Sequence, residues 1–164
     1  MRRKKNKEFN NITIERVGSK GKSIGVADDG KTIIIDGGAP GDIVNILTTK
    51  QRKSYYQGKI TEFHKYSEIR TTPKCEHFGV CGGCKWQHIN YEEQLKFKEN
   101  EVENNLVRIG NLELPKITPI KAAKNDYFYR NKMEYSFSDS RWLSIEEIQS
   151  KKIIEEKNAL GFHI

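Results

Sequence analysis

The sequence predicts a small all-β barrel of five strands, followed by a smaller α+β region that carries a cluster of cysteines. Two observations support this fold class. Between residues 11 and 66, short runs rich in β-branched residues alternate with turn residues, and no helical periodicity separates them. From residue 75 onward, three cysteines are followed by one long helical pattern and then by two short strand-like runs. The 164 residues suffice for one or two small domains.

The five predicted strands are short and are separated by turn signals. They occupy residues 12–17, 23–27, 32–35, 42–47 and 55–63. Asp28–Lys31 is a tight hairpin signal, and Asp36–Gly41 is a wider loop whose glycines suit conformations that other residues avoid. Strands at this spacing favour a closed or nearly closed barrel of the oligonucleotide-binding (OB) type.

A match to the phosphate-loop pattern G-x-x-x-x-G-K-T occurs at residues 25–32. A working phosphate loop begins a helix whose N-terminus faces the phosphates. Here Lys31 is followed by a β-branched run, and Asp28 and Asp29 inside the loop would repel an anion. We therefore interpret this segment as a hairpin turn between two strands.

The positive charge of the chain is concentrated before the first cysteine. The net charge is +7, and residues 1–74 hold 16 Lys and Arg against 8 Asp and Glu, whereas residues 75–164 hold 13 against 14. A basic module of this kind attracts polyanions through phosphate contacts, although a solvated basic face would have the same composition. Residues 1–8 are expected to form a basic disordered arm ahead of a barrel over residues 9–70.

The predicted nucleic-acid surface of the barrel combines cations with aromatic side chains. Cations hold phosphates, and tyrosine rings stack on bases. Tyr55 and Tyr56 are neighbours on one strand and point to opposite faces, so one of the two is expected in the core. The candidate residues are Arg16, Lys20, Lys22, Lys50, Arg52, Lys53 and Tyr55.

The sequence contains no pattern for secretion or for a membrane span. Its longest aliphatic run is Ile33–Ile35, and 35% of its residues are hydrophobic. We therefore expect a cytoplasmic protein with no membrane partner and no obligate protein partner. In that reducing compartment, three clustered cysteines favour metal binding over disulfides.

Cys75, Cys81 and Cys84 form a C-x5-C-x2-C pattern. Three soft ligands need a fourth to complete a four-coordinate site. Iron–sulfur cubanes usually take four cysteines, whereas His77 or His88 could complete a zinc site of three cysteines and one histidine. The spacing leaves open zinc, an iron–sulfur cluster and a structural role without metal.

One long helix is predicted over residues 90–108, with Asn90 as its cap. Its apolar stripe is expected to pack in the core of the region that follows the barrel. The stripe consists of Tyr91, Leu95, Lys98, Val102, Leu106 and Ile109.

The last part of the chain is expected to hold two paired strands and a short helix. The strand-like runs are residues 132–138 and 159–163. Ser144 begins the short helix, over residues 144–152, and Glu147 stands where a capping acid belongs. An apolar strand that ends at the last residue indicates a fragment of a longer protein.

In this order, the segments resemble the N-terminal part of the RNA (uracil-5-)-methyltransferase family, in particular its 23S ribosomal RNA members. Residues 10–69 are similar to the TRAM domain, a small RNA-binding β-barrel. Residues 75–88 are the most specific match, and residues 91–96 continue it into the helix. Residues 129–134 and 160–163 also fit the family. The resemblance implies 23S ribosomal RNA as the partner.

In that family the three cysteines bind a 4Fe-4S cluster, so the resemblance implies Cys75, Cys81 and Cys84 as ligands. The family's fourth ligand is a cysteine downstream of residues 160–163, and this sequence has none there. Arg130 and Lys132 are candidates for RNA contact, because the matching stretch of the family lies near the substrate. The alternative is that Arg130 and Lys132 are ordinary surface charges with no role in RNA binding.

The family transfers a methyl group from S-adenosylmethionine to C5 of a uridine, after a cysteine thiolate has added to C6. The catalytic residues of the family lie in a C-terminal Rossmann-like domain that has no counterpart in these residues, so no catalytic residue is expected in this chain. The expected function is the RNA-recognition and iron–sulfur region of a 23S ribosomal RNA uridine methyltransferase. The alternative is a stand-alone RNA-binding module with a zinc site.

Overall fold

The computed structural model of the protein describes residues 6–152, 155 and 158–161. The chain divides into two compact units, and each is described by itself. The first contains residues 1–74 and 85–124, and the second contains residues 75–84 and 125–164. Residues 1–5 of the expected basic arm lie outside the described residues.

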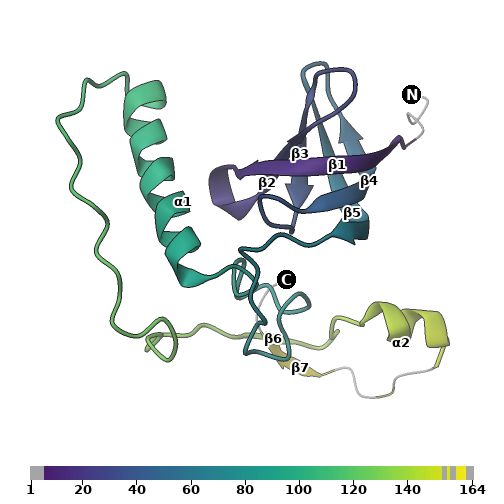
Figure 1. Cartoon of the computed structure of the whole chain (residues 1–164). Coiled ribbons are helices and arrows are strands. Elements are labelled where there is room, and N and C mark those ends of the chain that lie inside the picture. Colours follow the sequence, from purple (N-terminus) through teal and green to yellow (C-terminus); the bar gives the residue numbers. More distant parts are fainter. Residues whose placement is uncertain (1–5, 153–154, 156–157, 162–164) are drawn as a thin grey trace. The chain divides into compact units, whose positions relative to one another are not determined.

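The first unit is built around a closed barrel with the strand order β1-β2-β3-β5-β4 (Figure 1). Neighbouring strands are antiparallel except β3 and β5, which are parallel. The predicted five-stranded barrel is confirmed. Its strands are β1 (Glu8–Val17), β2 (Ser23–Val26), β3 (Thr32–Asp36), β4 (Ile43–Gln51) and β5 (Tyr55–Lys65).

The barrel core is formed by the alternate residues of each strand that point inward. Tyr56 is 2% exposed and packs against Phe9 with their ring centroids 5.1 Å apart, whereas its neighbour Tyr55 is only half-buried. This confirms that one of the two tyrosines belongs to the core. The other buried members of the cluster are Ile12, Ile14, Ala27, Ile33, Ile35, Val44 and Ile46.

The strand register places the loops at two opposite ends of the barrel. Thr32 pairs with Tyr55 and Asp36 with Lys59, so the turn after β2 and the β4–β5 connection share one end, which we call the hairpin end. The turn at residues 27–31 leads directly into β3, which confirms the hairpin interpretation of the phosphate-loop match. The opposite end, which we call the neck end, holds the loops at residues 18–22 and 37–42 and the end of β5.

A short two-stranded connection, which we call the neck, follows β5. Arg70 and Ile89 form an antiparallel bridge. The N–H of Thr71 donates to the carbonyl of His88 at 3.0 Å, and the N–H of Asn90 donates to the carbonyl of Ile69 at 2.9 Å. The segment that contains the cysteines therefore begins and ends at the neck. Residues 85–124 belong to the same compact unit as the barrel, and the expected boundary at residue 70 stays a prediction.

Helix α1 (Tyr91–Asn104) begins after Asn90, whose side chain accepts a hydrogen bond from the N–H of Glu93 at 3.0 Å. This confirms the predicted cap. A π-helical turn, η2 (Asn105–Ile109), continues the helix. The predicted core role of the apolar stripe is wrong for the described residues: none of the helix is buried, and Ile109 is 81% exposed. One aromatic contact of the helix is with Trp86, whose ring meets Phe97 edge-to-face.

The second unit contains a two-stranded sheet and a short helix. Strands β6 (Ser136–Ser138) and β7 (Ala159–Gly161) pair antiparallel, which confirms the expected pairing over a shorter length. The remainder of the expected strand 159–163 lies outside the described residues. Helix α2 (Ile145–Ser150) has the predicted capping box between Ser144 and Glu147. No helix in the described parts of either unit is long and apolar enough to span a bilayer.

Candidate nucleic-acid interface and cysteine loop

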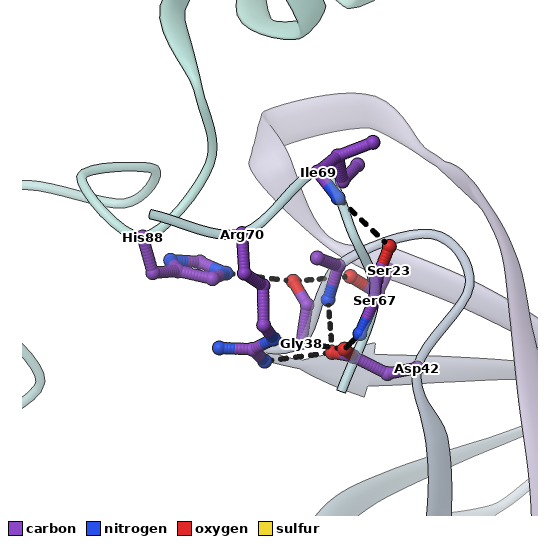
Figure 2. A network of polar contacts seen from close by, with 8 residues as sticks. Ser23, Gly38, Asp42, Ser67, Ile69, Arg70 and His88 are labelled. Carbon is purple, nitrogen blue, oxygen red and sulfur yellow. Dashed lines mark hydrogen bonds and ion pairs between the residues drawn. The ribbon is translucent and has the colours of Figure 1, made fainter. Parts of the chain in front are cut away.

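The carboxylate of Asp42 joins the loop at residues 37–42 to the chain that follows β5 at the neck end (Figure 2). It is fully buried. Oδ2 accepts from the N–H of Ala39 at 2.6 Å and from Arg70 Nη2 at 2.6 Å. Oδ1 accepts from the N–H of Ser67 at 2.8 Å and from Arg70 Nε at 2.8 Å. Burial alone would raise the pKa of Asp42, but the hydrogen bonds from Arg70, Ser67 and Ala39 hold that pKa below its ordinary value.

His88 attaches the other strand of the neck to the barrel (Figure 2). The residue is 7% exposed, and Nε2 lies 2.9 Å from the carbonyl oxygen of Gly38, to which the hydroxyl of Ser23 also donates. Because a carbonyl only accepts, Nε2 carries the proton. Burial is the main cause that lowers the pKa of His88. Of the two histidines considered for a zinc site, His88 therefore has its Nε2 engaged with the barrel.

The buried position of His88 predicts a pH dependence of stability. Its pKa in the fold lies below its value in the unfolded chain, about 6.5. Between these two values the unfolded chain binds more protons, so the free energy of unfolding should rise with pH and be fully present above about pH 6.5. Urea unfolding at pH 5.5 and 7.5 measures this difference. His88→Gln can still donate to Gly38 and should reduce the difference, and an unchanged pH dependence would refute the assignment.

The chain leaves β5 through an aromatic stack. The rings of Phe63 and Tyr66 are stacked with their centroids 5.0 Å apart and an interplanar angle of 25°. The guanidinium carbon of Arg70 lies 5.0 Å from both centroids. Tyr66 remains 62% exposed. Sequence reasoning missed Tyr66 and Arg70, although an aromatic residue near a cation was the signal used for the hairpin at residues 50–56.

The hairpin end carries four of the predicted RNA-binding residues. Lys50, Arg52 and Lys53 are exposed, and Tyr55 is half-buried. The N–H of Arg52 donates to the carbonyl of Tyr55 at 2.9 Å, which closes the turn. These cations therefore project from an ordered hairpin.

The other predicted cations of the barrel lie at the neck end. Arg16 near the end of β1 and Lys20 in the short 3-10 turn η1 (Ser19–Gly21) are exposed. Lys22 forms an ion pair with Asp36. The structure thus divides the predicted surface between the two ends of the barrel and does not bring its members together.

The described cysteine loop, residues 75–84, consists of tight turns in the second unit. The N–H of Phe78 donates to the carbonyl of Cys75 at 3.1 Å, and the N–H of Cys81 donates to the carbonyl of His77 at 2.9 Å. Cys75 and Cys84 are exposed and Cys81 is half-buried. The N–H of Gly83 lies 3.4 Å from Cys81 Sγ, a contact that suits a thiolate ligand.

The donor set of this loop has the right chemistry for a soft metal centre. Its three thiols and His77, which is exposed near Glu76, are ligand types for iron–sulfur clusters or zinc. Among the described residues, no three His, Cys, Asp or Glu side chains are grouped closely enough to hold a metal ion. The loop therefore has suitable ligands without a preformed site, and its sulfur atoms would have to converge on binding.

Arg130 and Lys132 lie in the second unit. Arg130 Nε donates to the carbonyl of Lys132 at 3.2 Å, and Lys132 Nζ is 3.2 Å from Glu134 Oε1. Both members of the Lys132–Glu134 pair are more than four-fifths exposed, so the pair contributes little to stability.

Comparison with known proteins identifies the family of the barrel. The family described as the TRAM domain matches residues 3–61, which include four of the five strands and part of the fifth. The barrel is a TRAM domain. Its matched region contains the whole hairpin end and stops before the aromatic stack and the neck.

The chain is also similar, over most of its length, to proteins named as uncharacterized RNA methyltransferases. One from Bacteroides thetaiotaomicron is 42% identical over 89% of this chain and 32% of its own length. Others from Porphyromonas gingivalis and Chlorobaculum tepidum are 40% and 39% identical, each over 93% of this chain and about a third of their own length. The chain thus spans about a third of the length of these relatives.

Proposed function

We propose that this chain is the RNA-recognition region of an RNA methyltransferase and that its TRAM domain binds unpaired RNA. The observation that carries the proposal is the ordered hairpin of a TRAM barrel from which Lys50, Arg52 and Lys53 project into solvent. Cations on a rigid β-hairpin contact successive phosphates without reading sequence. The names of the relatives support RNA as the target of the longer protein.

The finer proposal is that the longer protein methylates C5 of a uridine in 23S ribosomal RNA, with S-adenosylmethionine as the methyl donor, in the cytoplasm. The resemblance of residues 75–88 to that family supports it. This chain would supply RNA binding, and we assign no catalytic residue to it. The three cysteines have ligand spacing, so none of them is proposed as the nucleophile.

Replacing Lys50, Arg52 and Lys53 by alanine is expected to weaken RNA binding and to flatten its salt dependence. Each phosphate contact on a single strand contributes about 0.7 to the slope of log K against log salt, so loss of three contacts should reduce the slope by about 2. Fluorescence anisotropy of a labelled unpaired RNA across a series of salt concentrations measures this slope.

The matched control variant removes three positive charges from residues outside the barrel. Lys116, Lys121 and Lys124 are exposed and lie outside the barrel, so their replacement by alanine should leave most of the slope intact. If both triple variants lower affinity and slope equally, the effect reflects net charge and the hairpin is not the binding surface.

We further propose that Cys75, Cys81 and Cys84 bind a 4Fe-4S cluster. Three thiolates on one loop and the N–H of Gly83 directed at Cys81 Sγ support this. A bound cluster would supply a rigid centre that gathers the loop, while the chain's own thiolates would hold it. Zinc bound by the three cysteines and His77 is the alternative.

Anaerobic reconstitution with iron and sulfide, in the presence of a small thiol as the fourth ligand, tests the metal proposal. We expect iron and sulfide to bind to the chain and Cys81→Ser to abolish their binding. His77→Gln should retain the cluster. If the chain instead takes up zinc in preference and His77→Gln releases it, the zinc alternative replaces the cluster.

A further inference from the structure

The neck end of the barrel carries an exposed aromatic ring that the hairpin surface does not explain. Tyr66 follows the last residue of β5, and the residue is 62% exposed. An exposed tyrosine alone needs no explanation, since single apolar side chains are common on protein surfaces. The Tyr66 ring differs from such single exposed side chains because two neighbouring residues hold it in place.

Two neighbours fix the orientation of the Tyr66 ring. Phe63, which packs on the barrel core, stacks against it at 5.0 Å and 25°. Arg70 lies 5.0 Å from the same two ring centroids, and the buried carboxylate of Asp42 holds its guanidinium with two hydrogen bonds of 2.8 and 2.6 Å. The ring is therefore attached to the barrel core through Phe63 and to a buried ion pair through Arg70.

We propose that Tyr66 is a stacking platform for an unpaired base of the bound RNA. This inference rests on the proposed RNA binding of the barrel and adds a second contact at the opposite end from the hairpin. A flat ring with one side supported by a second ring and most of its area exposed can receive a base by stacking. Stacking tolerates every base, because every base has a π-face.

The charges around the platform fit this assignment. The charge of Arg70 is matched by Asp42, so Arg70 positions the ring and is not a phosphate contact. Two exposed cations that could hold phosphates lie at the same end of the barrel: Lys65 at the end of β5, and Arg16 near the end of β1. Phosphates and a base could therefore be held at the same end of the barrel.

The experiment compares the whole 164-residue chain with its Tyr66→Ala and Tyr66→Phe variants for binding to labelled oligouridine. Tyr66→Ala should lose about fivefold or more in affinity, whereas Tyr66→Phe keeps the flat ring and should bind like the wild type. The salt slope should stay the same in both, because no charge is removed. Tyr66→Leu covers Phe63 without a flat face and should behave like Tyr66→Ala.

Two controls show whether the loss comes from stacking. Phe137→Ala removes a ring that is 86% exposed in the second unit and should leave binding unchanged. An RNA of the same length that lacks its bases keeps the phosphates but offers nothing to stack. On that RNA, wild type and Tyr66→Ala should bind equally.

The outcomes separate the platform from the proposed function. If the wild type does not bind oligouridine at low salt, the proposed RNA binding itself fails, and the platform with it. If the wild type binds and Tyr66→Ala and Tyr66→Leu bind as tightly, RNA binding stands and the platform is overturned. Equal losses by Tyr66→Ala on RNA with and without bases would also overturn it.

Discussion

Asp42→Ala should lower the free energy of unfolding by about 3–5 kcal/mol, because it breaks a buried ion pair and leaves the guanidinium of Arg70 without its partner. The carboxylate is fully buried, and the Arg70 side chain is 20% exposed. The N–H groups of Ala39 and Ser67 lose their acceptor as well. Urea unfolding followed by circular dichroism at pH 7 measures the loss.

An exposed ion pair provides the control for this prediction. Asp36 pairs with Lys22, and its side chain is 57% exposed, so Asp36→Ala should cost less than about 1 kcal/mol. Equal losses in the two variants would show that Asp42 does not hold the neck on the barrel.

Because the pKa of Asp42 is lowered in the fold, the stability that the Asp42–Arg70 ion pair contributes depends on pH. Its contribution to stability is fully present above the unfolded pKa of about 3.8, and it is lost as the pH falls through the lower folded value. The wild type should therefore lose stability in acid below about pH 4 more steeply than Asp42→Ala, as acid titration of the unfolding midpoint would reveal.

Gly38→Ala is expected to cost about 2–6 kcal/mol, since it combines two penalties. Gly38 has a φ of +81°, a conformation that strains an alanine by about 1–3 kcal/mol. An added Cβ would also lie 2.3 Å from Ile14 Cδ1 in the barrel core, and overpacking costs about 1–3 kcal/mol. A backbone movement that relieves this close contact would also displace the carbonyl of Gly38, which accepts the hydrogen bond from His88. Thermal unfolding measures the combined effect.

A substitution at the preceding residue, Gly37, measures the conformational penalty without the packing penalty. Gly37 has the same φ of +81°, but its added Cβ would meet no atom within 4 Å. Gly37→Ala should therefore lose only the conformational part. If Gly38→Ala is no more destabilising than Gly37→Ala, the packing of Ile14 against residue 38 is not as tight as described.

The sequence was sufficient for the barrel because its signals are local. β-branched runs such as Ile33–Ile35 and turn residues such as Asp29 and Gly30 specify strands and hairpins within a few residues. The caps at Asn90 and Ser144 were predictable for the same reason, since each bonds to the residue three positions later.

The neck and the aromatic stack could not be predicted because their partners are distant in sequence. Asp42 meets Arg70 across 28 residues, and His88 meets Gly38 across 50. The apolar stripe of α1 was mispredicted for a related reason. Helical periodicity shows which residues share a face, such as Val102 and Leu106, but not whether another element covers that face.

We propose above that the TRAM domain of this chain binds unpaired RNA through its basic surface. The most direct test is the affinity of the whole chain for an unpaired RNA from low to physiological salt. We expect measurable binding at low salt, with log K falling linearly with log salt. Absence of binding at low salt, or an affinity that does not change with salt, would contradict it.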